Sequence, residues 1–231
     1  MPDARLVELL DSGTRRLVRS VDKMADDEWA GPSLLPGWTR AHVVAHLTLN
    51  AEGLSGALEG VHEGRPRTMY ASDAARDGDI AELARATPSE LRDRFLASTT
   101  VVGEWIEELA DNLAATPIER TPGGRRFQAG DVGTMRVREV EIHHADLGLD
   151  YTAADWPEEF VVLLLDSRSG ADHDGTPFLA RAVDLDRTWP FGTGGPTVSG
   201  SGSALAWWVT GRGTGDGLTS DDGRVPRMGP W

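Results

Sequence analysis

The segment REVEIHHADLGLDY, residues 138 to 151, places two glutamates and two adjacent histidines within what its composition predicts to be one helix. Residues four apart on a helix point to the same side, so Glu139 and His143 could reach one ion together. Glu141 and His144 lie three apart and could also share a face. Periodicity alone does not choose between the two pairs. The segment therefore predicts either a polar outer face or half of a metal site.

A third histidine, His46, falls on the apolar face of another predicted helix, beside Val43 and Leu47. Metal sites in helical bundles are commonly built from side chains that project into the core from facing helices. His46, Glu139 and His143 would make a three-ligand set with a fourth position open, as in catalytic zinc sites. Each signal is weak singly, because a Glu and a His four apart are more often a solvated pair and a lone buried histidine is more often hydrogen-bonded.

Two arginines could bind a carboxylate, which suits the planar donor fork of the guanidinium. Arg76 lies in the acidic stretch AARDGDI, where an exposed ion pair is the simpler interpretation. Arg212 ends a short apolar stretch, where a cation would also suit the helix dipole. Asn50, one turn after His46, could orient the site or lie on the helix surface. Three other histidines lack partners at ligand spacing and are expected to be surface or structural residues: His42, His62 and His173.

Composition narrows the classes of function. The chain has 231 residues, with 23 Lys and Arg against 37 Asp and Glu, a net charge of -14 and a pI near 4.8. This charge argues against binding to nucleic acid or anionic lipid.

The sequence shows no signal peptide and no apolar run of membrane-spanning length, so we expect a cytoplasmic protein that is not bound to a membrane. There is no cysteine, so any metal must be held by nitrogen and oxygen, and any thiol must come from elsewhere. Nothing in the sequence indicates an oligomeric state.

Helical periodicity dominates the first ~150 residues, and four long helices there predict a bundle. The predicted long helices cover residues 6–24, 41–61 after an N-cap at Thr39, 89–113 and 134–148, and a shorter helix follows Ser72. Residues 114–133 contain Pro and Gly and are expected to be a connection.

The pattern changes after Trp156. Residues 157–170 predict one more helix, 178–191 have the alternation of a strand, 192–203 supply turns, and 204–212 predict a short helix. We therefore predict an α+β protein with a four-helix bundle at 1–152 and a smaller α/β domain at 153–231.

Four stretches carry a resemblance to a known family. They are GWTRAHVVAHLTLNAEGL at 37–54, MYASDAARDGDIAELA at 69–84, MRVREVEIHHADLGLDY at 135–151 and LAWWVTGRGTGDGL at 205–218. With these motifs the chain resembles the mycothiol-dependent maleylpyruvate isomerase family. The resemblance implies a DinB-like four-helix bundle followed by a small α/β domain.

The resemblance also implies site residues and cofactors. His46, Glu139 and His143 would be the zinc ligands, with water completing the site, which favours this pair over Glu141 and His144. Arg76 and Arg212 would face the active site, the latter from the C-terminal domain. Mycothiol would supply the thiol, which fits the absence of cysteine, and the substrate would be a small dicarboxylate.

The expected reaction is a cis–trans isomerisation of maleylpyruvate to fumarylpyruvate, as in gentisate-type aromatic degradation. Reversible addition of a thiolate to the conjugated double bond would give an enolate that rotates before the thiol leaves. Two alternatives remain open: a mycothiol S-transferase that consumes the thiol, and a non-catalytic metal-binding or sensor bundle. The stoichiometry of the thiol separates the two enzymes. The open ligand position beside the arginines argues against a sensor, since a sensor would be expected to close its metal site.

Overall fold

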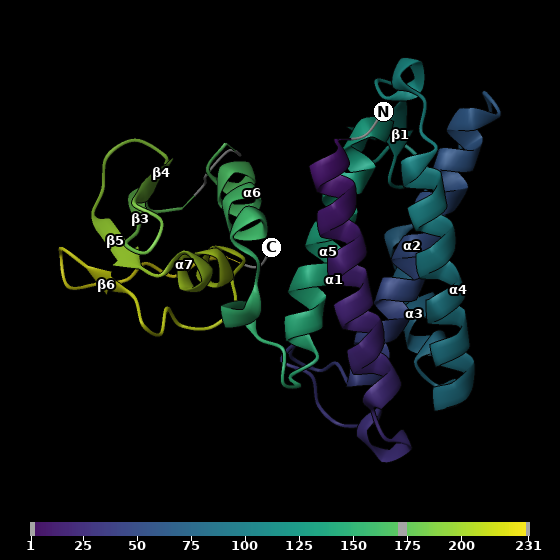
Figure 1. The fold of residues 1–231 in the computed structure, drawn as a ribbon, viewed down its shortest axis with the longest axis horizontal. Helices are drawn as coiled ribbons and strands as arrows, with labels where there is room; N and C mark the ends of the chain where they lie inside the picture. The colour runs from purple at the N-terminus through teal and green to yellow at the C-terminus, as the bar shows by residue number, and fades with distance from the viewer. Residues whose placement is uncertain (1–2, 171–174, 230–231) are drawn as a thin grey trace. The chain divides into compact units, whose positions relative to one another are not determined.

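The computed structural model describes residues 3–170 and 175–229 and confirms the predicted α+β fold. The chain separates into two compact units, Met1–Asp150 and Tyr151–Trp231 (Figure 1). Helices make up most of the first unit, and the second combines a sheet with helices.

The first unit contains a helical bundle and a small hairpin. Its helices are α1 (Ala4–Lys23), α2 (Arg40–His62), α3 (Asp73–Leu83), α4 (Pro88–Glu107) and α5 (Val132–Asp146). In the bundle α2 packs on α4, α1 packs on α5, and α2 also contacts α5, while α3 packs against α2. The segment expected to be a plain connection between α4 and α5 also forms a two-stranded hairpin, β1 (Pro117–Glu119) with β2 (Arg126–Gln128). Strands of three residues are too short for periodicity to reveal.

Polar side chains set where these helices begin. The Thr39 hydroxyl accepts from the backbone of His42 and starts α2, and Ser72 accepts from Ala75 and starts α3. Helix α4 begins slightly earlier than expected from Ser89, because Thr87 forms a capping box with Glu90. Both α2 and α3 carry residues of interest for function, so these caps help to position the site.

The second unit has a four-stranded sheet in the order β4-β3-β5-β6. Its elements are α6 (Glu158–Ser169), β3 (Phe178–Ala182), β4 (Arg187–Phe191), β5 (Thr197–Gly200), α7 (Gly202–Val209) and β6 (Thr219–Ser220). The predicted single strand at 178–191 is wrong: the chain turns at 183–186, and β3 pairs antiparallel with β4. The segment expected to supply turns contains β5, which pairs parallel to β3.

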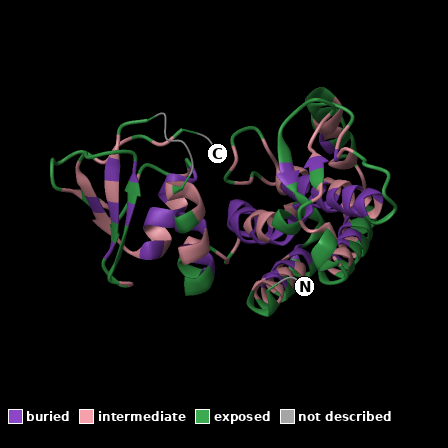
Figure 2. Cartoon of the chain, turned by 90° about the horizontal axis from the view of Figure 1, so that it is seen from above, coloured by how far each residue is buried: buried purple, intermediate pink, exposed green. Residues whose placement is uncertain are grey.

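Both units bury apolar residues where their elements pack, and Figure 2 shows all buried residues in purple. Leu17, Leu47 and Phe95 lie fully inside the bundle, and Phe178 stacks on Phe191 in the second unit with ring centroids 4.5 Å apart. Within the described residues, no helix is both long and apolar enough to span a bilayer.

Candidate metal centre

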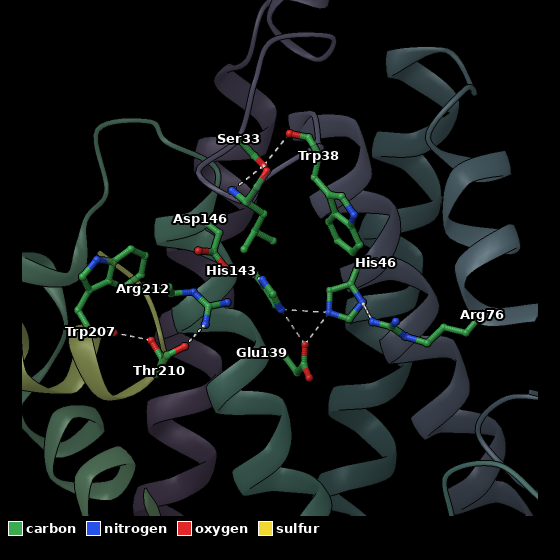
Figure 3. Close-up of polar contacts among 11 residues, drawn as sticks. Ser33, Trp38, His46, Arg76, Glu139, His143, Asp146, Trp207, Thr210 and Arg212 are labelled. Atoms are coloured by element: carbon green, nitrogen blue, oxygen red, sulfur yellow. Dashed lines mark hydrogen bonds and ion pairs between the residues drawn. The ribbon is translucent and has the colours of Figure 1, made fainter. Parts of the chain in front are cut away.

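Three donor side chains from two helices converge at one point in the first unit (Figure 3). His46 comes from α2, and Glu139 and His143 come from consecutive turns of α5. The Nε2 of His46 lies 2.8 Å from the Oε2 of Glu139 and 3.1 Å from the Nε2 of His143. The Nε2 of His143 lies 3.3 Å from the same Glu139 oxygen. Packing of α2 on α5 thus brings His46 to Glu139 and His143, although His46 precedes Glu139 by 93 residues in the chain.

The donor set fits a divalent ion. Two imidazole nitrogens and one carboxylate oxygen are a known catalytic zinc set. Ligands about 2.0–2.1 Å from a tetrahedral zinc lie roughly 3.3 Å from one another, close to the three separations in this group. His46 and His143 are only 5% and 7% exposed, whereas the Glu139 side chain is 19% exposed. The group is therefore buried but retains some contact with the exterior.

Burial and charge oppose each other at these three residues. Burial raises the pKa of Glu139, but His46 and His143 outweigh it and hold that pKa well below its ordinary value. Burial lowers the pKa of His46, which Glu139 only partly offsets. Burial also lowers the pKa of His143, but hydrogen bonds to Asp146 and Glu139 outweigh it and leave that pKa raised. The carboxylate is therefore ionised and His46 neutral, which are the states that bind a metal.

Asp146 orients His143. Its Oδ2 accepts from the Nδ1 of His143 at 2.8 Å, and the residue is fully buried. A proton held on Nδ1 leaves Nε2 free to face a metal, as in carboxylate–histidine–zinc arrangements. The sequence patterns above do not identify Asp146, although its position three residues after His143, one helical turn away, is a usable signal.

Arg76 on α3 lies beside His46. One guanidinium nitrogen pairs with Asp77 at 2.8 Å, and another lies 3.2 Å from the Nδ1 of His46. The local ion pair expected from the acidic stretch is present, and it does not prevent contact with the donor group. A guanidinium only donates hydrogen bonds, so Nδ1 of His46 must accept, and the imidazole proton then lies on Nε2.

The alternative pair, Glu141 and His144, faces a different helix. The Oε1 of Glu141 accepts from Arg16 at 2.6 Å, and the Nε2 of His144 lies 2.8 Å from the Ser20 hydroxyl. Arg16 and Ser20 both belong to α1. Glu141 and His144 are each 1% exposed, and the two glutamates and two histidines of the segment form two separate clusters, in which only Glu139 is partly exposed.

Asn50 contacts a buried arginine that the sequence patterns do not identify. The guanidinium of Arg136 donates to the side-chain oxygen of Asn50 at 2.9 Å and to the Leu47 carbonyl at 3.0 Å. Burial lowers the pKa of Arg136 to about 10, against the opposing charges of Glu139 and Tyr70. Arg136 thus places a buried positive charge on α5, three residues before Glu139.

Arg212 belongs to the second unit. Helix α7 ends at Val209, so Arg212 follows the helix and does not form its last turn. Its guanidinium donates to the Thr210 carbonyl at 3.1 Å and lies 5.7 Å from the Trp207 ring centroid (Figure 3).

Of the histidines expected to be structural, His42 lies 2.7 Å from the Thr39 hydroxyl at the start of α2. His62 packs on Trp105 with ring centroids 5.8 Å apart. His173 lies outside the described residues.

An α+β fold with two histidines and a glutamate converging inside its helical unit defines a bundle protein with a candidate metal centre. The chain belongs to the family of the mycothiol maleylpyruvate isomerase N-terminal domain, which matches residues 10–148.

Two solved structures are similar over the whole chain. One is the crystal structure of the mycothiol-dependent maleylpyruvate isomerase, and the other is a histidine-to-alanine mutant of it. Each is 29% identical with a TM-score of 0.90, covering 100% of this chain and 98% of the other. No curated protein gives a match.

Proposed function

We propose that this protein is a zinc- and mycothiol-dependent cis–trans isomerase that converts maleylpyruvate to fumarylpyruvate by reversible thiolate addition. The observation that carries the proposal is the convergence of His46, Glu139 and His143 in a chain of this family. The similarity to a solved mycothiol-dependent maleylpyruvate isomerase over the full length supports maleylpyruvate as the substrate and mycothiol as the thiol.

His46, Glu139 and His143 would hold the metal. Zinc, when bound, lowers the pKa of a thiol from ~8.5, so that a thiolate is present at neutral pH. Asp146 keeps the proton of His143 on Nδ1 and so keeps the liganding nitrogen bare.

Arg76 and Arg212 would bind the two carboxylates of the substrate. Arg76 is 3.2 Å from His46, so a carboxylate held by it lies next to the donor group. Arg212 would act from the second unit. The net charge of -14 repels an anionic substrate, which makes local cations necessary for binding.

The deciding experiment is an absorbance assay of zinc-loaded protein with maleylpyruvate, with and without mycothiol, coupled to quantitation of free thiol. We expect thiol-dependent conversion to fumarylpyruvate with the thiol pool unchanged. Loss of thiol in proportion to substrate would identify an S-transferase instead, and absence of any reaction would contradict both enzymes.

A matched pair of histidine variants tests the metal site. His46→Ala should lose bound zinc and activity together while its circular dichroism stays native. His62→Ala, which removes a histidine packed on Trp105 of α4, should keep both. Full activity of His46→Ala without zinc would disprove the assignment.

A further inference from the structure

Tyr70 is held rigidly in the segment between α2 and α3. Its backbone N–H donates to the Arg120 carbonyl at 3.0 Å, and the preceding N–H, of Met69, donates to the Glu119 carbonyl at 3.3 Å. The side chain of Met69 is buried at 8% exposure. These contacts attach the segment to the end of β1 and fix the position of the Tyr70 backbone.

A glycine in α2 allows this segment to lie close to the helix. A Cβ on Gly53 would lie 3.0 Å from the Met69 carbonyl oxygen and 3.5 Å from the Cε1 of Tyr70. Gly53 comes seven residues, about two helical turns, after His46, so both lie on the same face of α2. The tyrosine ring therefore packs on the helix face that carries the first donor.

Two arginines contact the tyrosine ring. The Cζ of Arg76 lies 5.9 Å from the ring centroid, and the Cζ of Arg120 lies 5.3 Å from it. Arg76 also contacts the Nδ1 of His46 at 3.2 Å, so one guanidinium bridges Tyr70 and the donor group.

The phenol is neutral at working pH. Burial raises the pKa of Tyr70, and the nearby Glu139 charge raises it further, against the opposing effects of Arg76 and Arg120. A neutral phenol can donate a hydrogen bond, and the contact of Arg76 with both the tyrosine ring and His46 places this phenol in the surroundings of the donor group.

We propose that Tyr70 contacts the substrate as a hydrogen-bond donor, its hydroxyl pointing to the carbonyl oxygen conjugated with the isomerising double bond. This inference rests on the proposed function. Addition of the thiolate forms one C–S bond and moves the π-electron pair onto the carbonyl oxygen, giving an enolate. Rotation follows, and return of the pair re-forms the double bond and expels the thiolate. Tyr70 keeps its proton throughout and stabilises the enolate more than the neutral carbonyl.

The chain has two tyrosines, which provides a matched control. Tyr70→Phe keeps the ring and its packing but removes the donor, whereas Tyr151→Phe removes a hydroxyl that faces the Asp155 carbonyl at 3.5 Å. We expect Tyr70→Phe to lower kcat about 10- to 100-fold with little change in KM or zinc content. Tyr151→Phe should match the wild type. An unchanged kcat in Tyr70→Phe would overturn the proposal.

A second pair of variants moves the tyrosine without changing it. Gly53→Ala should displace the segment and lower kcat, while Gly56→Ala, whose added Cβ meets nothing within 4 Å, should not. Wild-type kcat in Gly53→Ala would contradict the required position of Tyr70.

Direct binding separates failure of this inference from failure of the proposed function. Acetopyruvate, a stable enolic 2,4-dioxo acid, can be titrated calorimetrically into the zinc-loaded wild type and Tyr70→Phe. Binding weakened about fivefold or more by the substitution would support the donor even if maleylpyruvate is not isomerised. Equal affinities, or no binding to either protein, would overturn it.

Discussion

At the scale of single residues, the hydrogen bond from Nδ1 of His143 to Asp146 orients the imidazole so that Nε2 faces the other two donors. Asp146→Asn keeps the shape of the side chain and removes its charge. We expect zinc affinity to fall about 10- to 100-fold, as is typical when a partner of a liganding histidine is changed. Competition with a chromophoric chelator measures this, and Asp11→Asn, which changes an exposed aspartate paired with Arg15, is the control. An unchanged affinity in Asp146→Asn would contradict the orienting role.

The raised pKa of His143 predicts how zinc binding depends on pH. A protonated Nε2 cannot bind a metal, so zinc must displace that proton. As pH falls through this raised pKa, the apparent affinity should weaken by about tenfold per pH unit, beginning above the ordinary value of about 6.5. Chelator titrations between about pH 8 and pH 5.5 test this. In Asp146→Asn the decline should begin at lower pH, because the hydrogen bond that raises the His143 pKa is weakened. Affinity independent of pH would exclude His143 as a ligand.

Arg76 and a metal compete for the protonation state of His46. The hydrogen bond from Arg76 requires Nδ1 of His46 to be an acceptor. A metal bound to Nε2 places the imidazole proton on Nδ1, so that two hydrogen-bond donors, Nδ1 and the guanidinium of Arg76, would face each other. Metal binding should therefore release Arg76 toward the substrate. We expect Arg76→Gln to bind zinc several-fold more tightly. Its kcat/KM should nevertheless fall at least about tenfold, because the variant lacks the guanidinium that binds a substrate carboxylate. Weaker zinc binding in this variant would contradict the competition, and Arg85→Gln, an exposed arginine of the same region, serves as the control.

At the scale of elements, the close contact of α1 with α5 depends on Gly13. A Cβ at this position would lie 2.5 Å from the Oε1 of Glu141, which pairs with Arg16. We expect Gly13→Ala to reduce the free energy of unfolding by about 2 kcal/mol, because the added Cβ displaces the buried carboxylate of Glu141 from its contact with Arg16. Urea unfolding followed by circular dichroism measures the change.

The control for Gly13→Ala is a helical glycine with open space. Gly103→Ala in α4 meets nothing within 4 Å, so it should stabilise the protein by about 0.5–1 kcal/mol through helix propensity alone. Destabilisation of both variants by the same amount would show that the contact with Glu141 is not the cause.

At the scale of the whole molecule, all three donors and Asp146 belong to the first unit, whereas Arg212 belongs to the second. We propose residues 1–152 as a metal-binding domain and 153–231 as a domain that contributes to substrate binding. A protein consisting of residues 1–152 should therefore bind zinc with near-native affinity and lack isomerase activity. In the full chain, Arg212→Ala should lower activity and keep zinc. Unchanged kcat and KM in Arg212→Ala would contradict its role.

Much of the helical unit could be predicted from sequence, because amphipathic periodicity and N-caps are local properties. Thr39 and Ser72 begin helices where they were expected to. The short strands were missed or merged, because three to five residues cannot establish a period and their pairing is a long-range property.

The sequence by itself determined the α+β class, the absence of thiol ligands and the spacing that puts Glu139 and His143 on one face of a helix. It could not decide between that pair and Glu141 with His144, since both spacings are compatible with a shared face. Only the tertiary structure decided this: α5 is packed on one side by α2, which brings His46 to Glu139 and His143, and on another by α1, whose Arg16 neutralises Glu141. The reason is physical, because a buried carboxylate must find a partner, and which partner it meets depends on helix packing across distances that local patterns do not encode.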